Sequence, residues 1–182
     1  GHRFVPEDKG NFTYLVQELR KVLGNKALIT FAAGGFQKFR DESADWKPVM
    51  DVVDFVNIMS YDLVNGYSKV TGHHTPLFSS NPEMESTDRA VTYLEKIGIP
   101  SNKLVIGAAF YARVWKNVPD INHGLYQSGD FLRTYRFAEV DSMVTNKTGF
   151  TKFWDDATKA PYAYNPSEQI FMTFDDMQSV RL

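Results

Sequence analysis

The stretch that decides the fold is residues 55–63, which read "FVNIMSYDL". An apolar run of the length of one buried strand comes first, and a tyrosine and an aspartate end it. An unpaired carboxylate is costly to bury, so an aspartate has no role inside such a strand. We therefore expect Tyr61 and Asp62 to lie where the strand ends, facing a polar site or a turn.

Helices and strands alternate on both sides of this stretch. Apolar residues at helical spacing predict a helix over residues 11–23, and Gly24 is typical of the residue that ends it. Four further segments predict, in order, a strand, a short helix, a helix and a strand: 26–35 ("KALITFAAGG"), 46–53 ("WKPVMDVV"), 86–98 ("STDRAVTYLEKIG") and 103–115 ("KLVIGAAFYARVW"). Such alternation indicates a parallel sheet with helices outside it.

Each predicted strand has one face that mixes small, polar and large side chains. The members of these faces are Leu28, Thr30 and Ala32, then Phe55, Asn57, Met59 and Tyr61, then Val105, Gly107, Ala109, Tyr111 and Arg113. Such a mixture suits the interior of a barrel better than a surface beneath a helix. The pattern therefore favours an α/β fold that forms part of a barrel.

The alternation stops at about residue 117 and does not return before residue 172. This part of the chain is aromatic and rich in turns, and we expect a small α+β insertion of mixed strands and turns there. The predicted division is a partial barrel over 1–116, the insertion over 117–172, and the start of a last helix over 173–182. Three strand–helix units do not close a barrel, so we expect the remainder of the same barrel to be required.

The composition excludes several classes of function. The chain is 43% hydrophobic and 23% charged with a net charge of -2, and it has no basic stripe of the kind that binds nucleic acid. Its apolar runs are too short for a membrane span. It has no cysteine, which excludes a disulfide scaffold and a thiolate metal site. The aromatic share of 14% suits either a large core or a groove in which a ligand stacks.

The ends of the predicted strands carry the chemistry. In a barrel the functional residues lie at the carboxyl ends of the strands, which is where Tyr61, Asp62, Tyr111 and Arg113 fall. A phenol, a carboxylate and a guanidinium would form a polar site lined by flat rings. The residues leave a second interpretation open, in which Asp62 caps the following turn and Arg113 pairs with it.

Several segments resemble one known family. "DFVNIMSYD" resembles the Met-x-Tyr-Asp strand of family 18 glycoside hydrolases, the chitinase family. "GHHTPLF", "KLVIGAAFYARVW" and "APYAYN…QIFMTFDDMQSV" resemble segments that follow in the same order in bacterial chitinases. Residues 1–23 resemble the helix after the catalytic strand. The resemblance implies a (β/α)8 TIM barrel, here about strands five to seven, with an α+β insertion subdomain.

The resemblance also implies an activity. Family members hydrolyse β-1,4 links between N-acetylglucosamine units of chitin by a substrate-assisted retaining mechanism that needs no cofactor. Carried onto this sequence, Tyr61 orients the substrate's N-acetyl oxygen, and Asp62 lies near the acid glutamate and helps to keep it protonated. Met59 forms the floor beneath the sugar, and Tyr111 and Arg113 bind neighbouring sugar units.

Three further residues are candidates for substrate binding. Ala32 lies on the inner face of the first predicted strand, His73 lies in a loop that the resemblance places at the groove, and Tyr164 lies in the insertion. Tyr126 and Tyr162 are plausible walls of the same groove. For these tyrosines, packing in the core of the insertion is an equally open alternative.

The family's acid glutamate lies in an Asp-x-x-Asp-x-Asp-x-Glu motif, which this sequence does not contain. We therefore expect the segment alone to be inactive and the full-length parent to be a secreted chitinase. The alternative is a chitin-binding lectin on the same barrel, since the family includes members that have lost the glutamate. Neither alternative involves nucleic acid or a membrane span.

No metal site is predicted. Adjacent histidines such as His73 and His74 point in different directions, and the sequence suggests no third ligand. Trp154, Asp155 and Asp156 could bind a sugar or calcium. Two acids without a loop of alternating oxygen ligands more often form a solvated turn.

Overall fold

The computed structural model describes residues 5–144 and 146–182, so residues 1–4 of the segment compared with the family helix lie outside it. The chain divides into two compact units. Unit 1 comprises Gly1–Ser60 and Thr87–Gly107, and unit 2 comprises Tyr61–Ser86 and Ala108–Leu182. In this division the predicted boundary between residues 116 and 117 falls inside unit 2.

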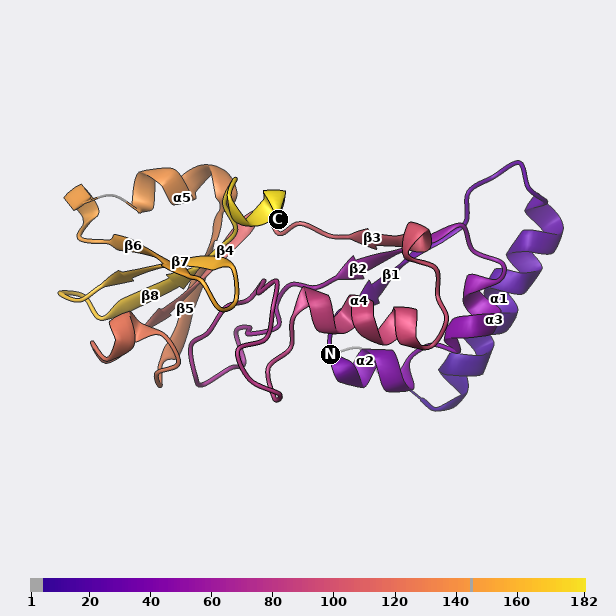
Figure 1. The fold of residues 1–182 in the computed structure, drawn as a ribbon, viewed down its shortest axis with the longest axis horizontal. Coiled ribbons are helices and arrows are strands. Elements are labelled where there is room, and N and C mark those ends of the chain that lie inside the picture. The colour runs from indigo at the N-terminus through magenta and orange to yellow at the C-terminus, as the bar shows by residue number, and fades with distance from the viewer. Residues whose placement is uncertain (1–4, 145) are drawn as a thin grey trace. The chain divides into compact units, whose positions relative to one another are not determined.

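Unit 1 contains a parallel sheet of three strands, which are β1 (Thr30–Gly34), β2 (Phe55–Met59) and β3 (Leu104–Ile106). The order across the sheet is β1-β2-β3, so each strand lies beside the next one along the chain (Figure 1). A doubly wound sheet reverses its strand order at the middle, whereas a barrel keeps it sequential. The topology therefore agrees with a portion of a barrel that is not closed within the described residues.

Helices cover one face of this sheet. They are α1 (Glu7–Leu23), α2 (Gln37–Glu42), α3 (Trp46–Met50), α4 (Thr87–Lys96) and the 3-10 helix η1 (Ser101–Lys103). Val56 and Ile58 of β2 form a single core with Val49 of α3 and with Ala90 and Leu94 of α4. The predicted short helix at 46–53 and the predicted helix at 86–98 are confirmed.

Within residues 5–144 and 146–182, no helix lies on the opposite face of the sheet. Phe55, Asn57 and Met59 alternate with the buried Val56 and Ile58 and are only half-buried. Thr30 and Ala32 of β1 are exposed, as is Val105 of β3. This is the face predicted to line the barrel interior, and the predicted alternation along β2 is confirmed.

The first helix is longer and less buried than its sequence predicts. It begins at Glu7 rather than at residue 11, and Val16 is its buried residue. Of the other apolar residues at helical spacing, Phe12 is partly buried against the core, whereas Leu15, Leu19, Val22 and Leu23 are exposed. Polar contacts also attach the helix, because Arg20 donates to the Val52 oxygen at 2.8 Å and to Asp54 Oδ2 at 2.7 Å.

The prediction of one strand over residues 103–115 is wrong. β3 ends at Ile106, and β4 (Tyr111–Lys116) belongs to a different, antiparallel sheet. The Gly107 N–H donates to the Ile58 oxygen at 2.9 Å, which is the last bond to the parallel sheet, and two alanines follow. Glycine and alanine have little strand preference, so nothing local holds the chain extended there. Tyr111 and Arg113 therefore do not continue the face of Val105.

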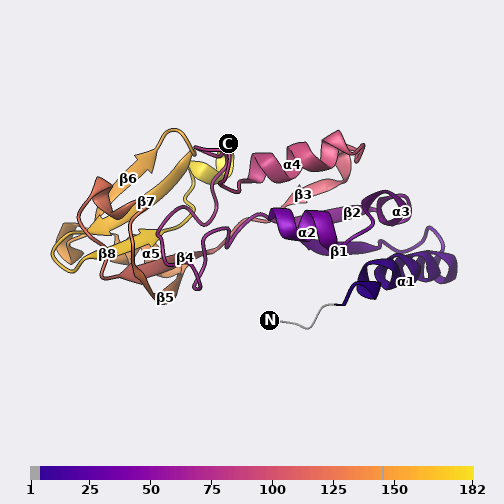
Figure 2. The same cartoon turned by 90° about the horizontal axis from the view of Figure 1, so that it is seen from below.

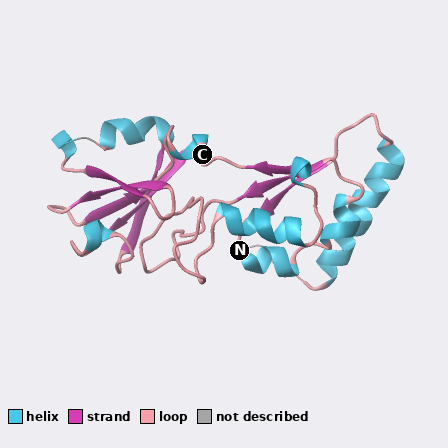
Figure 3. Ribbon diagram, in the orientation of Figure 1, coloured by secondary structure: helices cyan, strands magenta, loops and turns pink. Residues whose placement is uncertain are grey.

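Unit 2 is built on a five-stranded antiparallel sheet (Figures 2 and 3). Its order is β5-β4-β8-β7-β6, with bounds β5 (Asp130–Arg136), β6 (Thr151–Asp155), β7 (Ala160–Asn165) and β8 (Ile170–Thr173). It also contains α5 (Phe137–Met143) and the 3-10 helices η2 (Asn122–Gly124), η3 (Asn146–Thr148) and η4 (Ser179–Arg181). The predicted start of a last helix at 173–182 is thus only a short 3-10 turn.

Both faces of this sheet are covered. Ala163 and Met172 share one core with Val140 of α5, whereas Tyr162, Tyr164 and Phe171 belong to a second core. Strand residues point alternately to the two faces, which explains why neighbours in β7 and β8 enter different cores. Every residue of β7 is buried, as expected for a strand with strands on both sides and cover on both faces.

The long loop after β2 packs against the sheet of unit 2. Thr71 N donates to the Gln127 oxygen at 2.8 Å, and Thr71 Oγ1 donates to the Gly124 oxygen at 2.6 Å. Leu63 N donates to the His74 oxygen at 3.1 Å and closes the loop on itself. The two bonds of Thr71 join the loop to the chain between β4 and β5.

Among the described residues, no helix is both long and apolar enough to cross a membrane.

Candidate functional site

Asp62 adopts an unusual backbone conformation directly after β2. Its φ is +58°, in the left-handed region. Asn65 Nδ2 donates to the Asp62 main-chain oxygen at 3.1 Å and stabilises the turn. Non-glycine residues in this region are uncommon, and they cluster at ligand sites because surrounding contacts must hold them there.

Arg113 of β4 binds the Asp62 carboxylate with two hydrogen bonds. Its Nε donates to Oδ1 at 2.8 Å and its terminal nitrogen to Oδ2 at 2.7 Å. The other terminal nitrogen donates to Thr134 Oγ1 at 2.9 Å. Of the two interpretations that the sequence left open, the pairing of Arg113 with Asp62 is present. It does not remove the pair from solvent, because both side chains remain partly exposed.

The charge on Asp62 is stabilised by its neighbours. Burial raises the pKa of Asp62, but hydrogen bonds from Arg113 and Tyr111 and the charge of Arg113 outweigh it, and the pKa lies below its ordinary value. Burial and the nearby Asp62 charge raise the pKa of Tyr111. The site thus holds an ionised carboxylate beside a protonated phenol at neutral pH.

Aromatic rings surround this pair. Tyr61 and Tyr111 meet edge to face with centroids 6.0 Å apart, and the Arg113 guanidinium lies 5.0 Å from the Tyr111 ring centre. The ring of His74 lies 5.2 Å from that of Tyr111, and its Nδ1 is 3.9 Å from Asp62 Oδ1. Burial lowers the pKa of His74 to about 3 despite the nearby Asp62 charge, so His74 is neutral.

A pocket of about 500 Å³ opens beside Asp62 and Arg113. Asn65, Gly66, Tyr67 and Phe131 line the rest of it, and Tyr67 is 92% exposed. The sequence analysis missed these four residues. Asn65, Gly66 and Tyr67 could have been predicted from the sequence, because they follow Asp62 within five residues. Phe131 could not, because only the pairing of β5 with β4 brings it to the pocket.

Two predicted substrate contacts need correction. His73 is fully buried, with its Nε2 3.0 Å from Asp155 Oδ2. Tyr164 is also buried, and its hydroxyl donates to the Val118 oxygen at 2.7 Å. A buried side chain cannot contact a ligand without moving, so we assign both residues structural roles. For Tyr164, packing in the insertion core is the alternative that the structure favours.

Ala32 and Met59 both belong to unit 1. Ala32 is exposed on β1, and Met59 is half-buried at the end of β2. Both lie on the sheet face that has no helix, in agreement with a place in the barrel interior. Their contact with a substrate stays a prediction.

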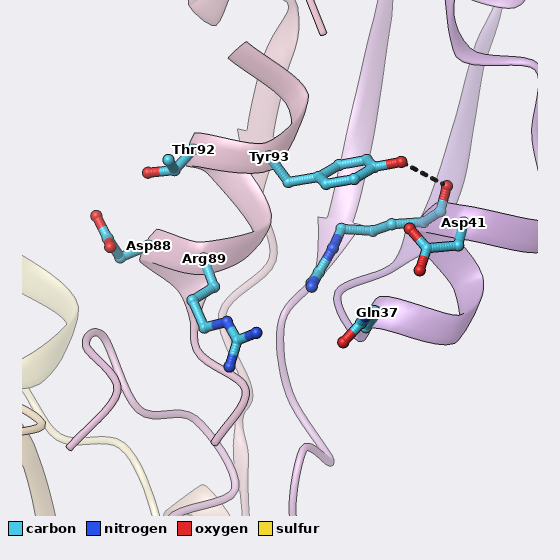
Figure 4. A pocket seen from close by; sticks show the side chains of 7 residues that line it. Gln37, Asp41, Asp88, Arg89, Thr92 and Tyr93 are labelled. Carbon is cyan, nitrogen blue, oxygen red and sulfur yellow. Dashed lines mark hydrogen bonds between the residues drawn. The ribbon is translucent and has the colours of Figure 1, made fainter. Parts of the chain in front are cut away.

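Unit 1 has a separate pocket of about 280 Å³ between α2 and α4 (Figure 4). There the Tyr93 hydroxyl donates to the Arg40 main-chain oxygen at 3.4 Å, and the Arg40 guanidinium lies 5.4 Å from the Tyr93 ring centre. Asp88 and Arg89 contribute opposite charges from α4. The residues that line it include none of the predicted site residues.

The described residues offer no metal centre. They contain no group of three or more histidine, cysteine, aspartate or glutamate side chains that could hold a metal ion. His73 and His74 have different surroundings. They are adjacent in the chain, yet one bonds to Asp155 and the other packs on Tyr111 beside Asp62.

The comparison with known families shows which protein family the chain belongs to. The sequence profile of the glycosyl hydrolases family 18 matches residues 2–182. The chain belongs to this family. Its similarity to family 18 therefore extends through both units.

Individual relatives agree with the family. The chain is 31% identical to chitinase A1 of Niallia circulans over 99% of its length, and 28% identical to the oviduct-specific glycoprotein of Mus musculus over 94%. It covers only 29% and 26% of those two proteins. A solved structure of a family 18 N-acetylglucosaminidase from Paenibacillus barengoltzii matches 98% of the chain and 55% of that protein, with 37% identity and a TM-score of 0.88. The predicted fold class, a partial family 18 barrel with an insertion, is confirmed.

Proposed function

We propose that the protein containing this family 18 chain hydrolyses β-1,4 links between N-acetylglucosamine units of chitin or its oligosaccharides. The main support is the Asp62–Arg113 pair beside an open pocket with an exposed tyrosine. An ionised carboxylate, a guanidinium and the flat ring of Tyr67 suit a sugar, which offers hydroxyl groups and an apolar ring face.

In the proposed mechanism a glutamate outside these 182 residues donates a proton to the glycosidic oxygen. The carbonyl oxygen of the substrate's N-acetyl group attacks the anomeric carbon as the glycosidic bond breaks, and an oxazolinium ion forms. Water then gives a proton to the same glutamate and attacks the anomeric carbon, which breaks the bond to the N-acetyl oxygen and opens that ring. The two displacements leave the anomeric configuration unchanged.

Tyr61 is proposed to position the N-acetyl group. Within the part of the chain that the structure describes, the Tyr61 side chain has a ring contact with Tyr111, while no hydrogen bond engages its hydroxyl. That hydroxyl is therefore available to donate to the carbonyl oxygen. Holding this oxygen in line with the anomeric carbon would lower the entropic cost of the attack.

Asp62 is proposed to act through its charge. Arg113 holds the carboxylate in one orientation and keeps it ionised. A fixed negative charge close to the acid glutamate would raise the pKa of that glutamate and keep it protonated. The same charge would stabilise the positive charge that develops on the oxazolinium ion.

The test is turnover of a chitin oligosaccharide by the full-length protein, with the anomer of the first product recorded by proton NMR. Retained β configuration is expected. Equal hydrolysis of cellulose oligosaccharides, which lack the N-acetyl group, would contradict the mechanism.

Because chitin is an insoluble polymer, we further propose that the protein works outside the cytoplasm.

The second candidate function is chitin binding without hydrolysis. The observation in its favour is that the side chains around the pocket beside Asp62 are suited to bind a sugar and need no acid glutamate to do so. The residue that precedes this segment at the family's acid position separates the two functions. Calorimetric binding of a chitin oligosaccharide with no product formed would establish the lectin.

A further inference from the structure

Unit 2 contains a second pocket lined by aromatic rings and carboxylates. Its volume is about 310 Å³, at the lower end of the range for small-ligand sites. Its main lining residues are Tyr126, Trp154, Asp155 and Asp156, and we call it the Trp154 pocket. It shares no lining residue with the pocket beside Asp62.

Asp155 is a fixed hydrogen-bond acceptor in this pocket. It has a hydrogen bond of 3.0 Å with His73 Nε2, and its Oδ1 accepts from the Ala157 N–H at 3.0 Å. The hydrogen bond with His73 is the main reason that the pKa of Asp155 falls to about 2. The carboxylate is therefore ionised, and 15% of its side chain remains accessible.

Trp154 lines the pocket beside Asp156. Hydrogen bonds from Lys159 and then from the Trp154 side chain hold the pKa of Asp156 below its ordinary value. Partial burial limits the orientations of the Trp154 ring, so it can offer a flat surface at low entropic cost. Trp154 is half-buried at the end of β6.

Tyr126 is held in a strained conformation with its hydroxyl incompletely bonded. Its φ is +60°, and it is 37% exposed. The hydroxyl lies 3.4 Å from both Ser80 Oγ and Asp155 Oδ2, which is longer than the usual 2.7–2.8 Å of a hydroxyl hydrogen bond. Burial raises the pKa of Tyr126, so the group stays a phenol that can donate to a closer acceptor.

The charges of the pocket decide the class of ligand. Asp156 is paired with Lys159, and Asp155 accepts from two donors, so part of the negative charge of the pocket is already balanced and a cation gains less there. Two ionised carboxylates would repel an anion. What remains suits a neutral ligand with hydroxyl or amide groups for Tyr126 and Asp155 and an apolar face for Trp154.

We propose that the Trp154 pocket binds a further N-acetylglucosamine unit of the polymer, as a site separate from the pocket beside Asp62. This inference rests on the proposed function, because it takes the ligand from the same chain of sugars. Its effect would be on attachment to the polymer rather than on bond cleavage. A substrate too short to reach both pockets would not detect it.

The experiment compares Trp154→Ala with wild type in the full-length protein. Retention on insoluble chitin is expected to fall by about 3- to 10-fold, the loss of one aromatic contact. The value of kcat/KM on a short soluble N-acetylglucosaminide is expected to stay within about twofold. Tyr14→Ala is the matched control, since Tyr14 is an aromatic residue of α1 that is 70% exposed and lies far from the pocket in sequence. It is expected to change neither quantity.

Unchanged retention of the Trp154→Ala variant on chitin would overturn the inference while leaving the proposed function intact. An equal fall in retention and in kcat/KM on the short substrate would also overturn it, because it would place Trp154 in the main site. If wild type neither binds nor hydrolyses chitin, the proposed function fails and this inference with it. Should Trp154→Ala unfold, Tyr126→Phe removes the phenol donor of the same pocket and keeps its ring, and the same fall in retention on chitin, with kcat/KM on the short substrate unchanged, is expected.

Discussion

Arg113 and Asp62 are 51 residues apart in the sequence, yet they form two hydrogen bonds of 2.8 and 2.7 Å in the structure. Asp62 follows β2, the strand in "FVNIMSYDL". Arg113 lies on β4, in the antiparallel sheet of unit 2. Bonds from a planar guanidinium to both carboxylate oxygens fix orientation as well as charge. The pair therefore sets both the direction and the ionisation of Asp62.

Arg113→Lys should lower activity and move its acid limb. A lysine cannot form the two-pronged bond, so the pKa of Asp62 should rise toward its ordinary value. The wild-type pKa is depressed, so wild-type Asp62 stays ionised to lower pH than the variant does. The pH profile of kcat/KM should therefore lose activity at a higher pH in Arg113→Lys. An unshifted acid limb would show that Asp62 ionisation does not limit the reaction.

Tyr61→Phe should reduce kcat by about 100-fold if its hydroxyl positions the N-acetyl group. The ring contact with Tyr111 remains in the variant, so the melting temperature should hardly change. Steady-state kinetics on a chitin oligosaccharide and a thermal melt are the two measurements. Full activity in Tyr61→Phe would remove this residue from the mechanism.

Tyr67→Ala should weaken binding without loss of stability. Tyr67 is 92% exposed, so its removal is expected to change the free energy of unfolding by less than about 0.5 kcal/mol. The loss of one flat ring from the pocket should raise KM by about 3- to 10-fold, with kcat less affected. Tyr14→Ala, at an exposed aromatic residue of α1, is a suitable control. Equal KM values for the two variants would exclude Tyr67 from the site.

The bond between Asp155 and His73 should make stability depend on pH. The pKa of Asp155 is about 2 in the folded state and 3.8 in its ordinary state. A depressed pKa stabilises the fold above pH 4, and this contribution is lost as pH falls from about 4 to 2. We expect this contribution to the free energy of unfolding to be about 1–2 kcal/mol after allowance for solvent screening. Denaturant titrations of wild type and Asp155→Asn at pH 7 and pH 3 measure it. The difference in the free energy of unfolding between wild type and Asp155→Asn should be smaller at pH 3 than at pH 7. An equal difference at both pH values would contradict a stabilising bond between Asp155 and His73.

Local patterns in the sequence determined much of unit 1. The period of two along β2 separates Val56 and Ile58 from Phe55, Asn57 and Met59, and the structure places these groups on the predicted faces. The predicted helix over residues 86–98 contains α4, which buries Ala90 and Leu94. These signals are readable because they depend on residues within one turn or one strand of each other.

The tertiary structure alone decided where the chain leaves the parallel sheet. Residues 103–115 read as one apolar strand, but the hydrogen bonds of β3 end at Gly107 and those of β4 go to β5 and β8. A strand has no preference for one sheet over another in its own residues, because the partners that satisfy its N–H and C=O groups are distant in sequence. The same reason hid Phe131 from the sequence analysis and left Arg113 with two possible roles. It also placed His73 in the interior, since its partner Asp155 lies 82 residues further along the chain and only the folded sheet brings that carboxylate to the buried imidazole.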